Sequence, residues 1–225
     1  LNSFDFTQMQ DMENMFDGCT NLERVDLGPY YEAKDLVSVE EMFKGCENLR
    51  YIDLNFMYGM PYSLKGMFQG CKKLENLVMK NLITANVQSV VSMFEGCESI
   101  QHIDIFPFRF PMVNDFSFMF KGCKKLSFVN FEGIDTDYAD SMISMFEGSG
   151  FTSLDLSNFN TMFVSDFTSM FKDMTSLQTL NIPWSTDSAI NMTSMFENCG
   201  SLYSLNISTF ETPKIEKYDN IFKGD

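Results

Sequence analysis

The sequence predicts an α/β solenoid of about nine units, each with one short parallel strand and one short helix. The first observation is a Met-Phe pair, once Ile-Phe, whose first residue recurs at Met15, Met42, Met67, Met93, Met119, Met145, Met170, Met195 and Ile221. From Met15 to Ile221 the chain advances 206 residues in eight steps, so one unit is roughly 26 residues long. The second observation is an alternating apolar segment in each unit. We therefore expect residues 1–225 to form one elongated solenoid domain.

A short helix is predicted around each Met-Phe pair. Apolar residues precede the pair by six and three positions, as Val87 and Val90 precede Met93 and Phe94. Spacings of three and four place side chains on one face of a helix. Two residues after each Phe stands Gly, Asn or Asp, and these residues tolerate the left-handed conformation that ends many helices. A helix of two or three turns is not stable alone, so it has to pack against its neighbours.

A short strand is predicted after each helix. The pattern is L-x-x-L-D-L, as in Leu49 followed by Ile52, Asp53 and Leu54. Such alternation is typical of a strand with one buried face. Strands that are joined through a crossover must run parallel, so the strands of successive units should pair side by side.

The charge and composition restrict the partners. Apolar residues make up 44% of the chain, and 31 acidic against 16 basic residues give a net charge of −15. A chain this acidic repels nucleic acids and anionic membranes, and no apolar run is long enough for membrane insertion. Both ends fall inside a unit and no polar caps are visible, so we expect a slice of a longer protein.

Six cysteines could indicate disulfides or a metal site. Five of them lie one unit apart, at Cys19, Cys46, Cys71, Cys97 and Cys123, with Cys199 further on. Zinc sites use close pairs such as C-x-x-C, and the sequence has none. We therefore expect buried free thiols that pack as small apolar side chains, with no metal and no cofactor.

One file of residues should point outward from the sheet, between the two buried residues of each strand. Its members are Asp26, Asp53, Val78, Asp104, Asn130, Asp155, Asn181 and Asn206. Neighbouring carboxylates such as Asp26 and Asp53 should repel one another. Two interpretations stay open, namely a solvated ladder of acids and amides, or a cation, such as calcium, bridging the carboxylates.

A second outward file, two positions earlier, carries aromatic residues. Tyr51, His102 and Phe128 stand in it, and Phe106 lies two positions after the Asp file. These four residues are expected to form an aromatic cluster in the middle of the sheet. Exposed aromatic side chains are typical of recognition surfaces, although Phe106 and Phe128 could instead fold over the sheet edge or cover a neighbouring chain. The candidate binding residues are Tyr51, Asp53, His102, Asp104, Phe106, Phe128 and Asn130. His102 is the only histidine and no nucleophile motif accompanies it, so no catalytic residue is predicted.

The whole unit resembles the BspA-type leucine-rich repeat family. The segment from Leu154 to Thr161, followed by Val164 and Met170, is similar to the pattern L-x-x-L-D-L-S-x-F-D-T-x-x-V-x-x-M-x-x-M-F-x-G-C of that family, and the match recurs nine times. Departures occur at 148–151 and 183–186. The resemblance implies a surface protein with a role in adhesion and host contact, and it brings no catalytic residues.

The resulting hypothesis is a non-catalytic recognition or adhesion module, located at the cell surface or secreted. It would present its sheet face to a protein or a glycan. The alternative is a structural repeat, a spacer that associates with copies of itself in a surface assembly.

Overall fold

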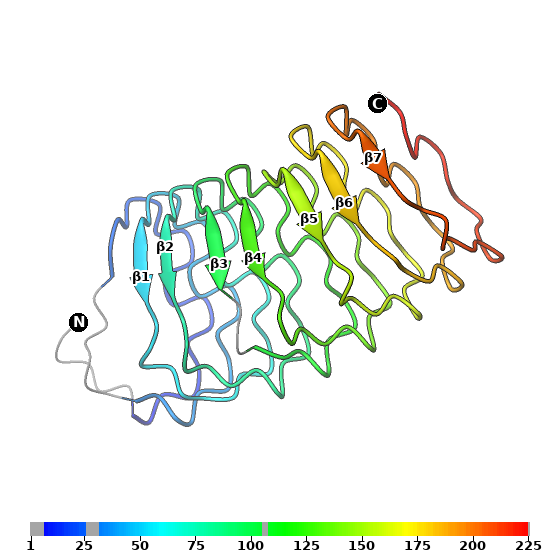
Figure 1. Ribbon diagram of the computed structural model, residues 1–225. Coiled ribbons are helices and arrows are strands. Elements are labelled where there is room, and N and C mark those ends of the chain that lie inside the picture. Colours follow the sequence, from blue (N-terminus) through cyan, green and yellow to red (C-terminus); the bar gives the residue numbers. More distant parts are fainter. Residues whose placement is uncertain (1–6, 26–31, 105–107, 225) are drawn as a thin grey trace.

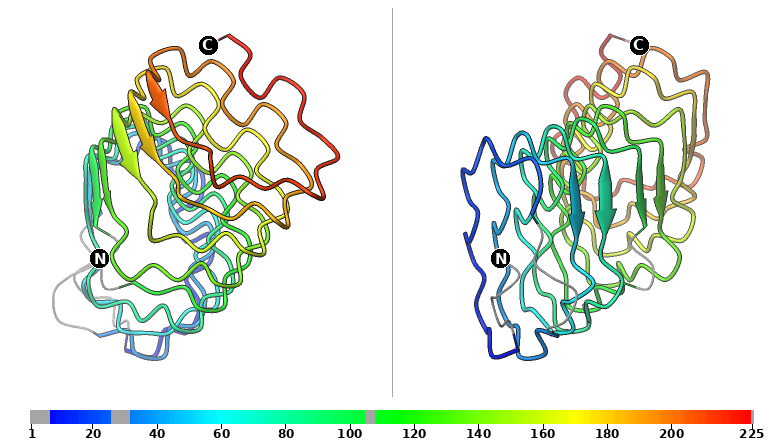
Figure 2. Two further views of the ribbon diagram at one scale, coloured as in Figure 1. Left: turned by 45° about the vertical axis from the view of Figure 1, so that its right-hand side comes forward. Right: turned by 90° about the vertical axis from the view of Figure 1, so that its left-hand side faces the viewer.

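The computed structural model describes residues 7–25, 32–104 and 108–224, and in them the chain forms a stacked series of similar coils (Figure 1). One strand per coil lines the front. The strands are β1 (Tyr51–Asp53), β2 (Asn76–Val78), β3 (His102–Asp104), β4 (Phe128–Asn130), β5 (Ser153–Asp155), β6 (Thr179–Asn181) and β7 (Ser204–Leu205). The side views show the strands on one wall and a wavy second wall opposite (Figure 2).

The strands that pair do so in parallel, as predicted, but pairing of every two successive strands is not met, because within the described residues β2 does not pair with β3 and β4 does not pair with β5. β1 pairs with β2, β3 pairs with β4, and β5, β6 and β7 form a three-stranded group. A single bridge from Arg24 to Tyr51 extends the first group toward the N-terminus. The middle residue of each strand faces the core, as Ile52 and Ile103 do, and its two neighbours face outward.

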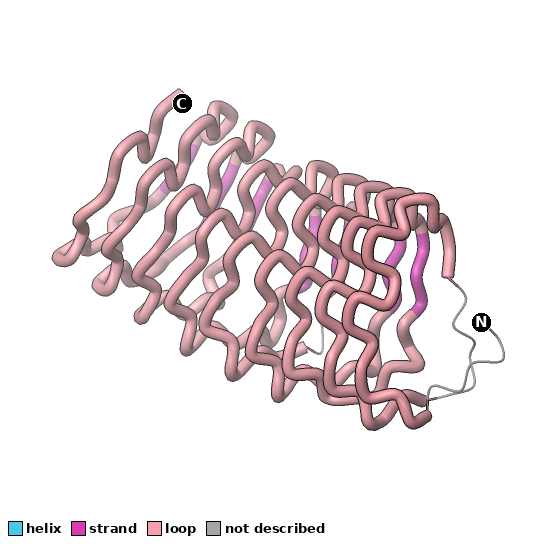
Figure 3. Tube along the Cα trace, turned by 180° about the vertical axis from the view of Figure 1, so that it is seen from behind, coloured by secondary structure: helices cyan, strands magenta, loops and turns pink. Residues whose placement is uncertain are grey.

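The predicted helices are wrong. The described residues contain only strands, turns and loops, and the wall opposite the sheet consists of turns (Figure 3). In the second unit the amide of Met42 donates to Val39, that of Lys44 to Glu41 and that of Cys46 to Phe43, each spanning three residues. The intervening amides donate to the next unit instead, for example Phe43 to Met67 at 2.9 Å. Every second amide therefore binds a neighbouring unit, and none is left for the four-residue bonds of an α-helix.

Backbone dihedrals show why a helix cannot form there. Each unit has two left-handed residues, one directly before the Met and one two residues after the Phe, such as Glu41 (φ 52°) and Gly45 (φ 69°). A left-handed residue interrupts a right-handed helix. The left-handed conformation that was expected at the glycines is confirmed, but it closes a turn. Turns of three residues also return apolar side chains every three positions, so the spacing fits both structures. We call these stacked turns the turn wall.

A continuous stack of phenylalanine rings fills the space behind the turn wall. It runs through Phe16, Phe43, Phe68, Phe94, Phe120, Phe146, Phe171, Phe196 and Phe222. Neighbouring ring centroids lie 5.2–5.9 Å apart and the rings are within 12° of parallel. The single tryptophan, Trp184, is buried in the same core and donates its indole N–H to the carbonyl of Leu156. Each unit is thus packed mainly by its two neighbours.

The cysteines bind backbone oxygens rather than one another. All six lie in the described part of the chain and none of them forms a disulfide there; Cys46, Cys71, Cys97, Cys123 and Cys199 are buried. Each of these five thiols donates to the carbonyl of the Phe in the preceding unit at 3.0–3.2 Å, as Cys97 does to Phe68. Burial raises the pKa of the Cys46 thiol to about 12, so the thiol stays protonated at neutral pH. The file of thiols therefore joins unit to unit.

No helix in residues 7–25, 32–104 or 108–224 is long and apolar enough to cross a lipid bilayer.

Candidate functional site

The outward files on the sheet face lie in register across the paired strands. Tyr51 stands opposite Asn76 and Asp53 opposite Val78 in the first pair. His102 stands opposite Phe128 and Asp104 opposite Asn130 in the second. Because parallel strands are spaced about 4.8 Å apart, facing side chains can touch. The sheet face therefore presents its outward side chains in short rows that run across the paired strands.

The structure brings two of the predicted aromatic residues together. The rings of His102 and Phe128 lie 6.2 Å apart between centroids, tilted by 44°. Phe128 is 53% exposed, which is unusual for a phenylalanine on a strand. The ring does not fold into the core, so the pair offers an apolar and aromatic contact to a partner.

Tyr51 does not join that pair. It lies on β1, two units away from β3, and it faces Asn76 on β2. The guanidinium carbon of Arg24 lies 5.6 Å from the centroid of the Tyr51 ring, a cation–π geometry. Phe106 lies outside the described residues. The predicted cluster of four aromatic residues is therefore, in the described part of the chain, a pair and a separate tyrosine.

The carboxylates of the Asp file are held by hydrogen bonds. Asp53 accepts from the backbone amide of Asn55 at 2.9 Å, and Asp155 accepts from the backbone amide of Ser157 at 2.9 Å. The side-chain amide of Asn181 also donates to Asp155, at 3.0 Å. The amide and hydroxyl of Ser157, together with the amide of Asn181, lower the pKa of Asp155.

From Asp104 to Asn181 this file alternates between Asp and Asn, so in that part of the stack a carboxylate meets an amide in the next unit. Asn130 approaches Asp104 in the same way, with its side-chain nitrogen 3.5 Å from the carboxylate oxygen. The repulsion that was expected between Asp26 and Asp53 cannot be placed, because Asp26 lies outside the described residues. Among the described residues, no group of three or more His, Cys, Asp or Glu is arranged to hold a metal ion.

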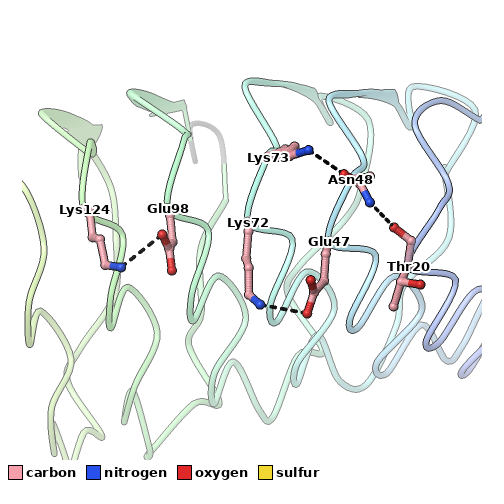
Figure 4. Close-up of polar contacts among 7 residues, drawn as sticks. All are labelled: Thr20, Glu47, Asn48, Lys72, Lys73, Glu98 and Lys124. Atoms are coloured by element: carbon pink, nitrogen blue, oxygen red, sulfur yellow. Dashed lines mark hydrogen bonds and ion pairs between the residues drawn. The ribbon is translucent and has the colours of Figure 1, made fainter.

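Sequence reasoning missed the ladders of alternating charge that join the units. At the position after the cysteine, Lys72 binds Glu47 at 2.7 Å and Lys124 binds Glu98 at 3.0 Å (Figure 4). One position further along, the ammonium group of Lys73 donates to the side-chain oxygen of Asn48, and the side-chain amide of Asn48 donates to the carbonyl of Thr20 (Figure 4). The signal is present in the sequence as Lys and Glu alternating at one position of the unit.

A second ladder follows the turn wall. Lys121 binds Glu147 at 3.1 Å, and Glu197 lies between Lys172 and Lys223. Exposed ion pairs contribute only about 0–1 kcal/mol each. Each of these ion pairs joins a residue of one unit to a residue of the next unit. On these two ladders positive and negative charges are paired, so the surplus of acidic residues lies on other surfaces.

The architecture places the protein in a recognisable class, a parallel solenoid with one short strand per unit, as in leucine-rich repeat proteins. More particularly, the chain belongs to the family described as "Mycoplasma protein of unknown function, DUF285", which matches residues 1–57, 60–150 and 115–225. No match was found among curated proteins.

Two solved structures are similar over most of the chain. One is a leucine-rich repeat protein from Bacteroides ovatus, with 14% identity, a TM-score of 0.39, and coverage of 94% of this chain and 73% of the other. The second is a leucine-rich cell surface protein from Faecalibacterium prausnitzii, with 14% identity, a TM-score of 0.27, and coverage of 95% and 79%.

Proposed function

We propose that the chain is a non-catalytic recognition module of the cell surface, which binds a protein or a glycan through its sheet face. The observation that carries the proposal is the exposed His102–Phe128 pair, fixed on two paired strands above a buried core. Aromatic side chains on a rigid support contribute much of the energy at recognition surfaces. The location at the surface rests on the resemblance to BspA-type repeats.

Polar groups complete the same surface. Asp104 and Asn130 lie next to the aromatic pair on the same two strands, and the side-chain nitrogen of Asn130 approaches the carboxylate of Asp104. Asp53 and Tyr51 supply a similar combination two units away. Stacking on an aromatic ring combined with hydrogen bonds from acids and amides suits a sugar or a polar protein loop.

The experiment measures saturable binding of the chain to arrays of glycans and of purified extracellular proteins. We expect the Phe128→Ala and Tyr51→Ala variants to weaken binding at least tenfold, with melting temperatures close to wild type. Tyr203→Ala is the matched control, because Tyr203 is 75% exposed and lies outside the pair. Equal binding by wild type and Phe128→Ala would rule the surface out. Light scattering in parallel tests the alternative, since a structural spacer would associate with itself.

A further inference from the structure

A second exposed apolar surface lies away from the sheet face. Large apolar side chains are exposed in the segments that connect the strands to the turn wall. The backbone of these segments follows the lower edge of the coils in Figure 1. They are Val37, Tyr58, Met60, Tyr62, Ile83, Met112, Tyr138, Met162, Phe163 and Ile190. Scattered exposed apolar residues need no explanation, but a contiguous group marks an interaction site.

Four of these side chains form one contiguous patch. Bridges pair Asp115 with Ser141 and Ser141 with Asp166 in successive units. Met112, Tyr138 and Phe163 each lie three residues before a member of this row, so they occupy the same position in three stacked units. Met162 precedes Phe163. We call these four residues the edge patch; they are 52%, 67%, 55% and 56% exposed in the order Met112, Tyr138, Phe163 and Met162.

The backbone beneath the edge patch is fixed by buried threonines. Thr136 donates its hydroxyl to the carbonyl of Asn160 at 3.1 Å and accepts from the amide of Asn160 at 2.8 Å. Thr161 donates to the carbonyl of Ser185 at 2.8 Å. Both threonines are almost fully buried. A partner therefore meets a preformed surface, and little ordering entropy is lost on binding.

Acidic residues flank the edge patch in the sequence. Asp135, Asp137 and Asp140 flank Tyr138 in the chain, and Asp187 takes the position of Met162 in the next unit, directly after a stacked threonine. Residues 126–171 contain no Lys or Arg. Arg109, in the preceding unit, stands three residues before Met112 in the chain. Partial burial and the charge of Asp115 raise the pKa of Asp140, in keeping with a surplus of negative charge there.

We propose that the edge patch binds a basic amphipathic polypeptide segment of another protein. Apolar side chains of the segment would cover Tyr138 and Phe163, and its Lys or Arg side chains would pair with the flanking carboxylates. An anionic membrane does not fit, because the carboxylates repel it. A second copy of the chain does not fit either, since a symmetric contact would bring the same carboxylates together. This site is separate from the sheet face and does not depend on its function.

The test uses a fluorescent 15-residue peptide of alternating lysine and leucine as the probe, with a second peptide in which glutamate replaces every lysine. We expect saturable binding of the lysine peptide that weakens with rising salt, and no binding of the glutamate peptide. The double variant Tyr138→Ser/Phe163→Ser should bind the lysine peptide at least tenfold more weakly. The double variant Asp137→Asn/Asp187→Asn should weaken binding severalfold and reduce its salt dependence.

Met60→Ser/Tyr62→Ser is the matched control, because these side chains are exposed on the same edge outside the patch. Residue-specific oxidation by hydrogen peroxide supplies a second readout, in which the peptide should protect Met112 and Met162 but not Met60. Equal weakening by the control variant, equal binding of the glutamate peptide, or equal protection of Met60 would overturn the proposal. Binding to vesicles of phosphatidylserine, or self-association that the Tyr138→Ser/Phe163→Ser variant abolishes, would also overturn it.

Discussion

Removing one ring from the middle of the phenylalanine stack tests how the fold is held together. Phe94 is fully buried, and its ring lies between those of Phe68 and Phe120 at centroid distances of 5.6 and 5.8 Å. Replacing a buried Phe by Ala costs about 3–5 kcal/mol. The two parallel ring contacts place this site near the upper end of the range, because each contributes about 0.5–1.5 kcal/mol beyond burial. We expect Phe94→Ala to lower the free energy of unfolding by about 4–5 kcal/mol.

Urea denaturation measures this loss with two probes. Far-UV circular dichroism reports on all units, and the fluorescence of Trp184 reports on the C-terminal part of the stack. Because units contact mainly their neighbours, the circular dichroism midpoint should fall further than the fluorescence midpoint. Phe128→Ala is the control, since a half-exposed residue should change stability by no more than about 0.5 kcal/mol. A loss below about 1 kcal/mol for Phe94→Ala would refute the stacked core.

Three further predictions concern individual side chains. Because Cys19 is exposed and the other cysteines are buried, Cys19 alone should react rapidly with a thiol reagent at pH 8 in the native protein, whereas all six thiols should react in denaturant. Rapid reaction of all six in the native protein would contradict the burial of the other five thiols. Ser149 stands at the position of a cysteine in the unit, and its buried hydroxyl has no hydrogen-bond partner among the described residues. The variant Ser149→Cys should therefore raise the free energy of unfolding, measured by urea titration, by about 1 kcal/mol. A decrease in the free energy of unfolding would contradict the role given to the thiols. Hydrogen bonds from Ser194 and Lys172 lower the pKa of Glu197, so its contribution to stability is complete above about pH 4.5 and is lost as the pH falls through the lower pKa of the folded state. The free energy of unfolding of Glu197→Gln should therefore decline less over that pH range than that of wild type. Parallel plots of the free energy of unfolding against pH for the two proteins would exclude the effect.

Much of the fold could be predicted because buried positions repeat with little variation. The period, the parallel strands and the inward residues such as Ile52 and Ile103 follow from apolar spacing alone. The turn wall could not be distinguished from helices, because its spacing of three residues fits both structures. The deciding feature is the left-handed residue before each Met, such as Ser92 (φ 57°) or Phe118 (φ 62°). Neither residue type favours that conformation by itself, and inter-unit hydrogen bonds hold it in place.

The candidate site was predictable only in part, for a related reason. The alternation of inward and outward side chains along a strand predicts that four residues lie on the outer face, namely His102, Phe128, Asp104 and Asn130. The pairing of β3 with β4 then places His102 opposite Phe128 and Asp104 opposite Asn130. The separation of Tyr51 from the pair follows from the order of the units, because β1 and β3 belong to units that are two apart in the stack. The close approach at Gly150 is similarly hidden, because a methyl group there would overlap the backbone of Lys124 in the preceding unit.

The arrangement separates stability from recognition. Inward strand residues stay aliphatic in every unit, whereas the outward file changes from Tyr51 to His102 to Phe128 along the stack. Backbone bonds, thiols and stacked rings join the units from inside, so outward positions can change at little cost to folding. A scaffold of this kind can carry independent surfaces on different sides, because the sheet face and the edge patch share units but no side chains. Variants at Phe128 and at Phe163 should therefore alter binding to different partners, with additive and small effects on stability.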